Sequence, residues 1–170
     1  MLKKKIEKAL NEQLNAELYS AYLYYSMAAY FEAENLSGLG NWMRAQAMEE
    51  LSHMDKFFKF INERGGKVEL KEIKAPDTKW EHPVAVFTQV CEHEASVTDL
   101  INELMDLAIK EKDFATKIFL DWFVSEQVEE EATAGKILHD LKAVKKSSQG
   151  LFMLDRELGQ RAFTMPAENE

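Results

Sequence analysis

Glu50-Leu51-Ser52-His53 places a carboxylate and an imidazole three positions apart, on one face of a helix. A second polar pair with the same spacing lies in Gln127-Val128-Glu129-Glu130. Glu50 follows Glu17 by 33 positions (50 − 17), and Gln127 follows Glu94 by the same 33 positions (127 − 94). Two matching half-sites, carried by four stretches with helical apolar periodicity, indicate a site for two metal ions.

The composition is that of one globular domain spanning residues 1–170. An apolar fraction of 46% is ordinary for a folded protein, and a net charge of −9 disfavours nucleic acid as a partner and suits a protein that handles cations. Cys91 is the single cysteine, so we expect neither an intrachain disulfide nor a cysteine metal cage. We expect a cytoplasmic protein with no membrane partner, since no apolar run is long enough to span a bilayer and the first residues do not resemble a signal peptide.

Apolar periodicity and helix-ending residues predict five helices. Gly65-Gly66 can end the second helix because glycine tolerates the left-handed conformation. Pro83 suits the first turn of the third helix, and Asp113 is the expected N-cap of the fourth. The predicted ranges are about 4–34, 38–64, 83–111, 113–146 and, for a short C-terminal helix, 149–161.

The segment between the second and third helices, residues 67–82, is long for a turn. Its extended length of roughly 50 Å exceeds the roughly 40 Å of a 27-residue helix, so it can run the whole length of a bundle. The helices that it joins should therefore be parallel, while the short connections on either side make antiparallel hairpins. The predicted fold class is all-α: a four-helix bundle with a long crossover and a short fifth helix.

The polar groups interrupt the apolar stripes of the four long helices near their middle. Glu17 and His53 lie 19 and 17 positions from the turn near residue 36 (36 − 17 and 53 − 36). Glu94 and Glu130 each lie 18 positions from the turn near residue 112 (112 − 94 and 130 − 112). All of these groups should therefore meet at one level of the bundle.

Several carboxylates in an apolar core need protons or cations to neutralise them. Oxygen ligands with an imidazole suit iron, manganese or zinc. Because a carboxylate has two oxygens, Glu50 can bridge two ions. The first ion would take Glu17, Glu50 and His53, and the second Glu50, Glu94 and Glu130, with Gln127 close by as a weak ligand or hydrogen-bond partner.

This pattern resembles that of the prokaryotic non-haem ferritins, bacterial and archaeal. The matching residues are Glu17, Glu50-x-x-His53, Glu94, Gln127-x-x-Glu130 and the strings at 19–24, 41–43, 126–131 and 151–158. The resemblance implies a ferritin-like subunit with ferroxidase activity, which oxidises Fe(II) with dioxygen at an intrasubunit di-iron site. It also implies a homo-oligomeric cage of about 24 subunits, in which Fe(III) is stored as a hydrated oxide mineral.

The resemblance implies three further features of the site. A third iron position maps onto Glu49, Glu126 and Glu129, with Glu130 shared. Tyr24 matches a tyrosine beside the paired site that can supply an electron. No haem is expected, because Leu51 stands where bacterioferritins have a haem-ligating methionine.

Other interpretations stay open at this point. Glu129 can belong to a solvated helix face, and Tyr24 can be an ordinary core residue. The histidines outside the pattern, His82, His93 and His139, are interpreted as surface or interface residues. A di-iron oxygenase acting on an organic substrate and a helical assembly module with a structural metal are the rival functions.

Overall fold

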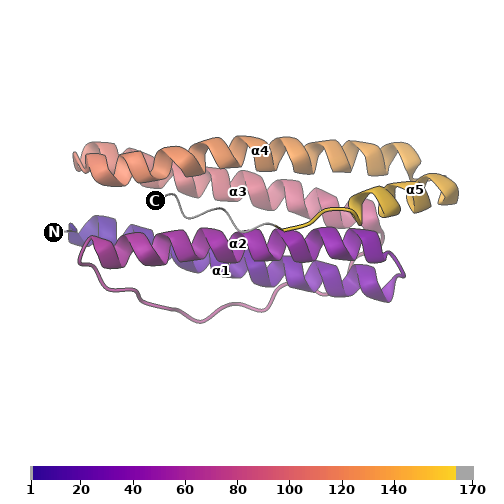
Figure 1. Ribbon diagram of the computed structural model, residues 1–170, viewed down its shortest axis with the longest axis horizontal. Helices are drawn as coiled ribbons and strands as arrows, with labels where there is room; N and C mark the ends of the chain where they lie inside the picture. The colour runs from indigo at the N-terminus through magenta and orange to yellow at the C-terminus, as the bar shows by residue number, and fades with distance from the viewer. Residues whose placement is uncertain (1, 164–170) are drawn as a thin grey trace.

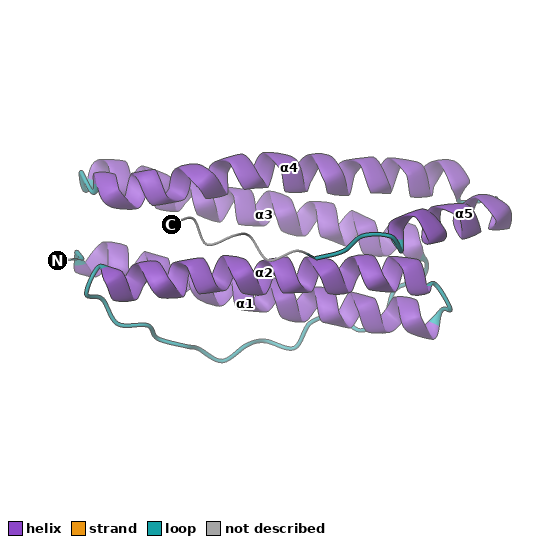
Figure 2. Cartoon of the chain, viewed as in Figure 1, coloured by secondary structure: helices purple, strands orange, loops and turns teal. Residues whose placement is uncertain are grey.

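The computed structural model describes residues 2–163, which form five α-helices and no strand. The helices are α1 (Lys4–Ala33), α2 (Ser37–Glu63), α3 (Pro83–Lys110), α4 (Phe114–Val144) and α5 (Ser148–Leu158). The first four lie side by side as a bundle, and α5 lies at one end of it (Figures 1 and 2). The predicted all-α four-helix bundle with a short fifth helix is confirmed, and every helix begins and ends within three residues of its predicted bounds.

Residues with left-handed backbone angles end three of the helices. Asn35 (φ 60°), Gly65 (φ 69°) and Lys112 (φ 54°) each stand two positions after the last residue of a helix. This conformation turns the chain sharply away from the helix axis. The short turns after α1 and α3 consequently make α1/α2 and α3/α4 antiparallel hairpins, as predicted (Figure 1).

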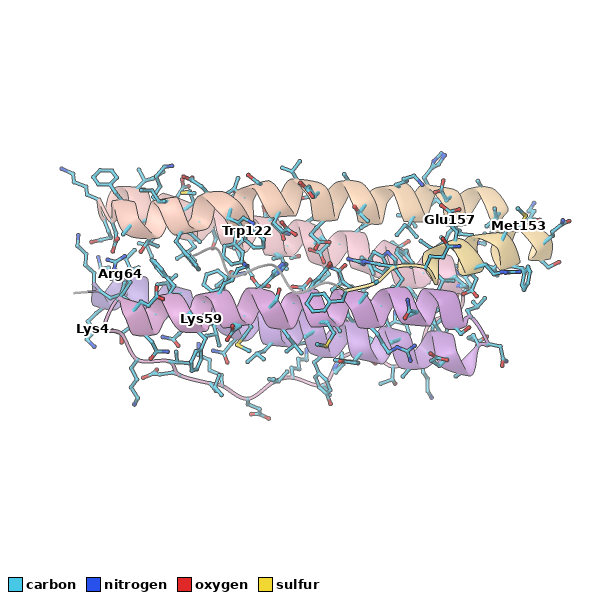
Figure 3. The ribbon with its side chains drawn as sticks, in the orientation of Figure 1. Lys4, Lys59, Arg64, Trp122, Met153 and Glu157 are labelled. Atoms are coloured by element: carbon cyan, nitrogen blue, oxygen red, sulfur yellow. The ribbon has the colours of Figure 1, made fainter. Side chains whose placement is uncertain are left out.

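The two hairpins are joined at one end by an ion pair. The Asp113 carboxylate caps α4 by accepting from the Thr116 N–H at 3.2 Å, as the sequence predicts. Arg64, at the end of α2 (Figure 3), donates to both oxygens of the same carboxylate at 3.1 and 3.0 Å. The guanidinium and these hydrogen bonds lower the pKa of Asp113, although its burial acts in the opposite direction.

The segment between α2 and α3 runs along the outside of α1 and α2 for the length of the bundle (Figure 2), so α2 and α3 are parallel. The side-chain amides of Asn11 and Asn15 on α1 each donate to one loop carbonyl and accept from one loop N–H, at 2.7–2.9 Å. Val68 and Trp80 pack against the core, but Leu70 is 68% exposed. Hydrogen bonds from α1 therefore hold the first part of this loop, in addition to the apolar packing of Val68 and Trp80.

The apolar core consists of two clusters, one toward each end of the bundle. The cluster nearer α5 includes Met27, Phe31 and Phe87, and the other includes Leu10, Phe57 and Ile101. Along every long helix, the polar residues singled out from the sequence lie between the two clusters. The sequence pattern of interrupted stripes thus becomes a polar layer across the middle of the bundle.

Candidate metal centre

The polar layer brings together the six side chains that the sequence predicts for the paired site. Each is at most 7% exposed, and together the six come from all four long helices. They are Glu17 from α1, Glu50 and His53 from α2, Glu94 from α3, and Gln127 and Glu130 from α4. A buried set of this kind requires compensation, because each carboxylate loses its hydration.

Glu17, Glu50 and His53 form the most compact part of the layer. One ligand atom from each of the three lies within 4.8 Å of the other two, close enough to hold one metal ion. The Nδ1 atom of His53 is 3.3 Å from Oε2 of Glu50, one helical turn away. These are the three residues expected to bind the first ion.

Two glutamines one turn before the carboxylates orient them. Gln13 donates from Nε2 to Oε1 of Glu17 at 2.8 Å, and Gln46 donates from Nε2 to Oε1 of Glu50 at 3.1 Å. Both contacts leave the second oxygen of each carboxylate free of that glutamine. The sequence signal for this role is an i, i+4 spacing on the same helix stripe, a spacing at which side chains meet.

Glu94 is held by protein donors on both oxygens. The Tyr24 hydroxyl donates to Oε1, and Nε2 of Gln127 donates to Oε2 at 3.2 Å. Burial and the charges of Glu94 and Glu50 raise the pKa of Tyr24 well above its ordinary value, so its hydroxyl stays protonated and remains a donor. Tyr24 is therefore placed beside the site by a direct hydrogen bond.

A second group of possible ligands lies on the α4 side. Atoms of His53, Glu126 and Glu130 lie within 4.8 Å of one another. This group differs from the second set expected from spacing, since it contains His53 and Glu126 in place of Glu50 and Glu94. Both Glu94 oxygens accept hydrogen bonds, one from Tyr24 and one from Gln127. Helical spacing alone does not predict this side-chain orientation.

The residues expected at the third iron position have three different environments. Glu126 is half-buried and belongs to the second group, while Glu129 is exposed. Glu49 is half-buried and forms an ion pair with Arg161, a residue that the sequence reasoning did not single out. The charges of Glu129 and Glu49 both act on Glu126, so the three carboxylates share one electrostatic neighbourhood.

Burial and mutual repulsion raise the pKa of the inner carboxyl groups. The pKa of Glu17 is raised to about 8, first by burial and then by the charge of Glu50. The pKa of Glu130 is raised to about 7 by burial and by Glu94, and that of Glu50 lies well above its usual range for the same kinds of reason. A divalent cation favours the ionised form of such groups and so competes with the proton.

His93 was interpreted as a surface or interface residue, but it packs against the site. Its Nε2 is 2.8 Å from the Ser20 hydroxyl oxygen, and its ring meets Tyr24 edge-on with centroids 6.1 Å apart. Its burial lowers its pKa, which favours the neutral imidazole. The sequence signal available for it is its position directly before Glu94.

Trp122 on α4 (Figure 3) packs beside the imidazole of the site. Its ring lies edge-on to His53, with the ring centroids 5.4 Å apart. The Lys56 ammonium lies 4.5 Å from the centroid of the Trp122 ring. The indole thus shields His53 on one side. These contacts make Trp122 a packing residue beside the site.

Comparison with known proteins assigns the chain to a family. The model of the ferritin-like domain matches residues 7–144, which carry the whole polar layer. The chain belongs to the ferritin family. Bacterial non-heme ferritin of Bacteroides fragilis is 44% identical to this ferritin over 161 residues, covering 95% of the chain and 100% of the relative. The Campylobacter jejuni protein of the same name is 39% identical over 92% of the chain and 93% of the relative.

Solved ferritin structures have the same fold. An open-pore ferritin from the hyperthermophilic archaeon Archaeoglobus fulgidus superposes with a TM-score of 0.94 at 50% identity, over 95% of this chain and 98% of that one. An engineered closed form of the Archaeoglobus ferritin gives a TM-score of 0.95, also at 50% identity, over 96% of this chain and 100% of that chain. Family membership supports a role in iron storage.

Within residues 2–163, no helix is both long and apolar enough to cross a membrane.

Proposed function

We propose that this ferritin-family chain is an iron-storage subunit with ferroxidase activity, which oxidises Fe(II) with dioxygen at a di-iron site in the polar layer. The observation that carries the proposal is the buried group of Glu17, Glu50 and His53, whose ligand atoms lie within 4.8 Å of one another. Family membership supports the storage role, and the donor set supports the redox role.

The residues of the layer suit iron as a substrate. Carboxylate oxygens and one imidazole are ligands that Fe(II) and Fe(III) accept, and thiolate ligands are not needed. Ionised carboxylates also favour the more highly charged Fe(III), which promotes the loss of an electron. On this proposal Glu17, Glu50 and His53 bind one Fe(II), and Glu130, Glu94 and Gln127 are the candidates for the second, with Glu50 as the bridge.

The surrounding groups would prepare these ligands. Gln13 and Gln46 hold one oxygen each of Glu17 and Glu50, which leaves the other oxygen to meet iron. Tyr24 holds Glu94 and is near enough to donate an electron through it. The two apolar clusters on either side limit the access of water, which strengthens every ion–carboxylate interaction in the layer.

Storage of a mineral requires an enclosed space that one bundle lacks. We therefore infer a homo-oligomeric cage of about 24 subunits, since closed symmetry is the usual route to a shell. We place this cage in the cytoplasm. On α5, Phe152 is 61% exposed and Met153, at the far end of the molecule in Figure 3, is 64% exposed. An exposed apolar face on this helix fits a contact between subunits at a symmetry axis. Sedimentation at high protein concentration and high salt tests this, because a monomer or dimer under those conditions would contradict the cage.

Replacement of His53 tests the paired site. We expect His53→Ala to keep the helical fold and to lose most of the fast Fe(II) oxidation, because His53 is the sole imidazole in the group. The matched control is His139→Ala, since His139 is exposed on α4. Initial rates of aerobic Fe(II) oxidation should fall only in His53→Ala. A wild-type rate in that variant would contradict the paired site, and Fe(II) binding without oxygen consumption in the wild type would favour a structural metal instead.

A further inference from the structure

The segment after α5 runs along α2 (Figure 1), and Arg161 in it reaches Gln46 and Glu49 at the polar layer. Asn41 on α2 fixes its backbone by donating from Nδ2 to the carbonyls of Gly159 at 3.2 Å and Arg161 at 2.8 Å. The Arg161 guanidinium lies over the ring of Trp42, 4.4 Å from its centroid. Arg161 therefore has a defined position although it lies outside every helix.

The Arg161 guanidinium makes two polar contacts with α2. Its Nη2 forms the ion pair with Glu49, and its Nη1 donates to Oε1 of Gln46 at 2.8 Å. Because a guanidinium is only a donor, this contact fixes the Gln46 amide with its oxygen toward Arg161 and its NH2 group toward the layer. That NH2 group donates to Glu50 at 3.1 Å. One amide thus connects the C-terminal segment to the central carboxylate of the site.

The ion pair has an electrostatic consequence for the acidic groups around it. Glu49 acts by its charge on both Glu126 and Glu130, which belong with His53 to the second group of possible ligands. A cation bound to this group would be stabilised by the negative charge of Glu49, but the Arg161 guanidinium is already paired with that carboxylate. Arg161 and a divalent cation therefore compete for the same carboxylate.

We propose that Arg161 is a positioning residue of the metal centre, whose guanidinium orients Gln46 toward Glu50 and competes with a divalent cation for Glu49. This inference rests on the proposed function of the polar layer. It means that the paired positions fill first, and that a cation engages Glu49 beside Glu126 only after Arg161 is displaced. Arg161, in the segment after α5, then controls how readily a cation occupies the position next to the pair.

Binding of Zn²⁺, which has no redox chemistry of its own, tests the proposal without an activity assay. The variant is Arg161→Gln and the matched control is Arg156→Gln, which also removes one positive charge near the C-terminus. Arg156 is exposed, with its guanidinium 5.9 Å from the Phe152 ring centroid. Calorimetric titration of the intact assembly should show the weakest-bound Zn²⁺ gaining about tenfold in affinity in Arg161→Gln alone, the effect of removing a unit charge beside a divalent cation. Adding Glu49→Gln should abolish the gain.

The outcomes separate this inference from the function on which it rests. If Arg161→Gln binds every Zn²⁺ as the control does, while the wild type binds Zn²⁺ in a manner that depends on His53, the role of Arg161 is refuted and the paired site stands. If His53→Ala binds Zn²⁺ as fully as the wild type does, the proposed function fails, and this inference fails with it. A gain that persists in Arg161→Gln with Glu49→Gln would refute the competition for Glu49.

Discussion

Replacement of Glu17 by glutamine should stabilise the metal-free protein and flatten its dependence on pH. Glutamine has the same shape, keeps the acceptor oxygen for Gln13, and carries no charge. In the wild type, the pKa of Glu17 is raised from 4.5 to about 8 by burial and by Glu50. The folded state therefore binds this proton more tightly than the unfolded state does.

The sign and the size follow from that difference. Above the unfolded pKa of 4.5, the unfolded chain releases the proton while the folded chain keeps it, so stability falls as pH rises and levels off above about 8. The full effect is about 5 kcal/mol, of which about 3 kcal/mol falls between pH 5 and pH 8. Glu17→Gln should remove most of this fall, since the substituted side chain does not titrate.

Urea unfolding followed by circular dichroism, with a chelator present and protein concentration held constant, measures the effect at pH 5 and pH 8. The control is Glu12→Gln, because Glu12 lies on the same helix with its side chain 52% exposed. Added Zn²⁺ should reverse the order, stabilising the wild type more than Glu17→Gln. If Glu17→Gln and the wild type lose stability equally from pH 5 to pH 8, ionisation of Glu17 does not cause the loss and this explanation is refuted.

Three other variants test the packing and the chemistry. Gly38→Ala should lower stability by at least about 2 kcal/mol in urea unfolding, because the added Cβ would lie 1.7 Å from a backbone oxygen of α5. Tyr24→Phe should lower the free energy of unfolding by about 1–3 kcal/mol in the same assay at pH 8, since a buried oxygen of Glu94 loses its donor. An unchanged free energy of unfolding would contradict this hydrogen bond. Glu126→Gln combined with Glu129→Gln should keep the rapid first oxidation of Fe(II) but alter the iron-to-oxygen ratio measured by an oxygen electrode; an unchanged ratio would return both residues to the solvated face.

The sequence predicts the polar layer well because helices convert spacing into position. Once Glu17 and His53 are placed on helices of known direction, their face and their height follow from the residue count and the turns. The same reasoning places Glu94 and Glu130 at that level. Four helices with interrupted apolar stripes have few ways to pack, since each polar interruption must avoid the apolar clusters of its neighbours.

Contacts outside the helical pattern could not be predicted in this way. Arg161 reaches Glu49 from an irregular segment 112 positions later in the chain, and no periodicity specifies where such a segment goes. His93 lies beside the stripe rather than on it, so its contact with Ser20 depends on the packing of α1 against α3. The orientation of Glu94 depends on which donors surround it, which is a property of the folded site.

The division of the core into two apolar clusters also bears on how the bundle moves. Among the described residues, a layer of buried carboxyl groups separates the two clusters, and these groups repel one another when they are ionised. Without cations, each end can therefore open with little help from the other. A cation bound to ligands from both hairpins acts as a cross-link at mid-height. Amide hydrogens at the two ends, far from any ligand, would then exchange as two separate cooperative units in the metal-free protein and as one unit in the loaded protein.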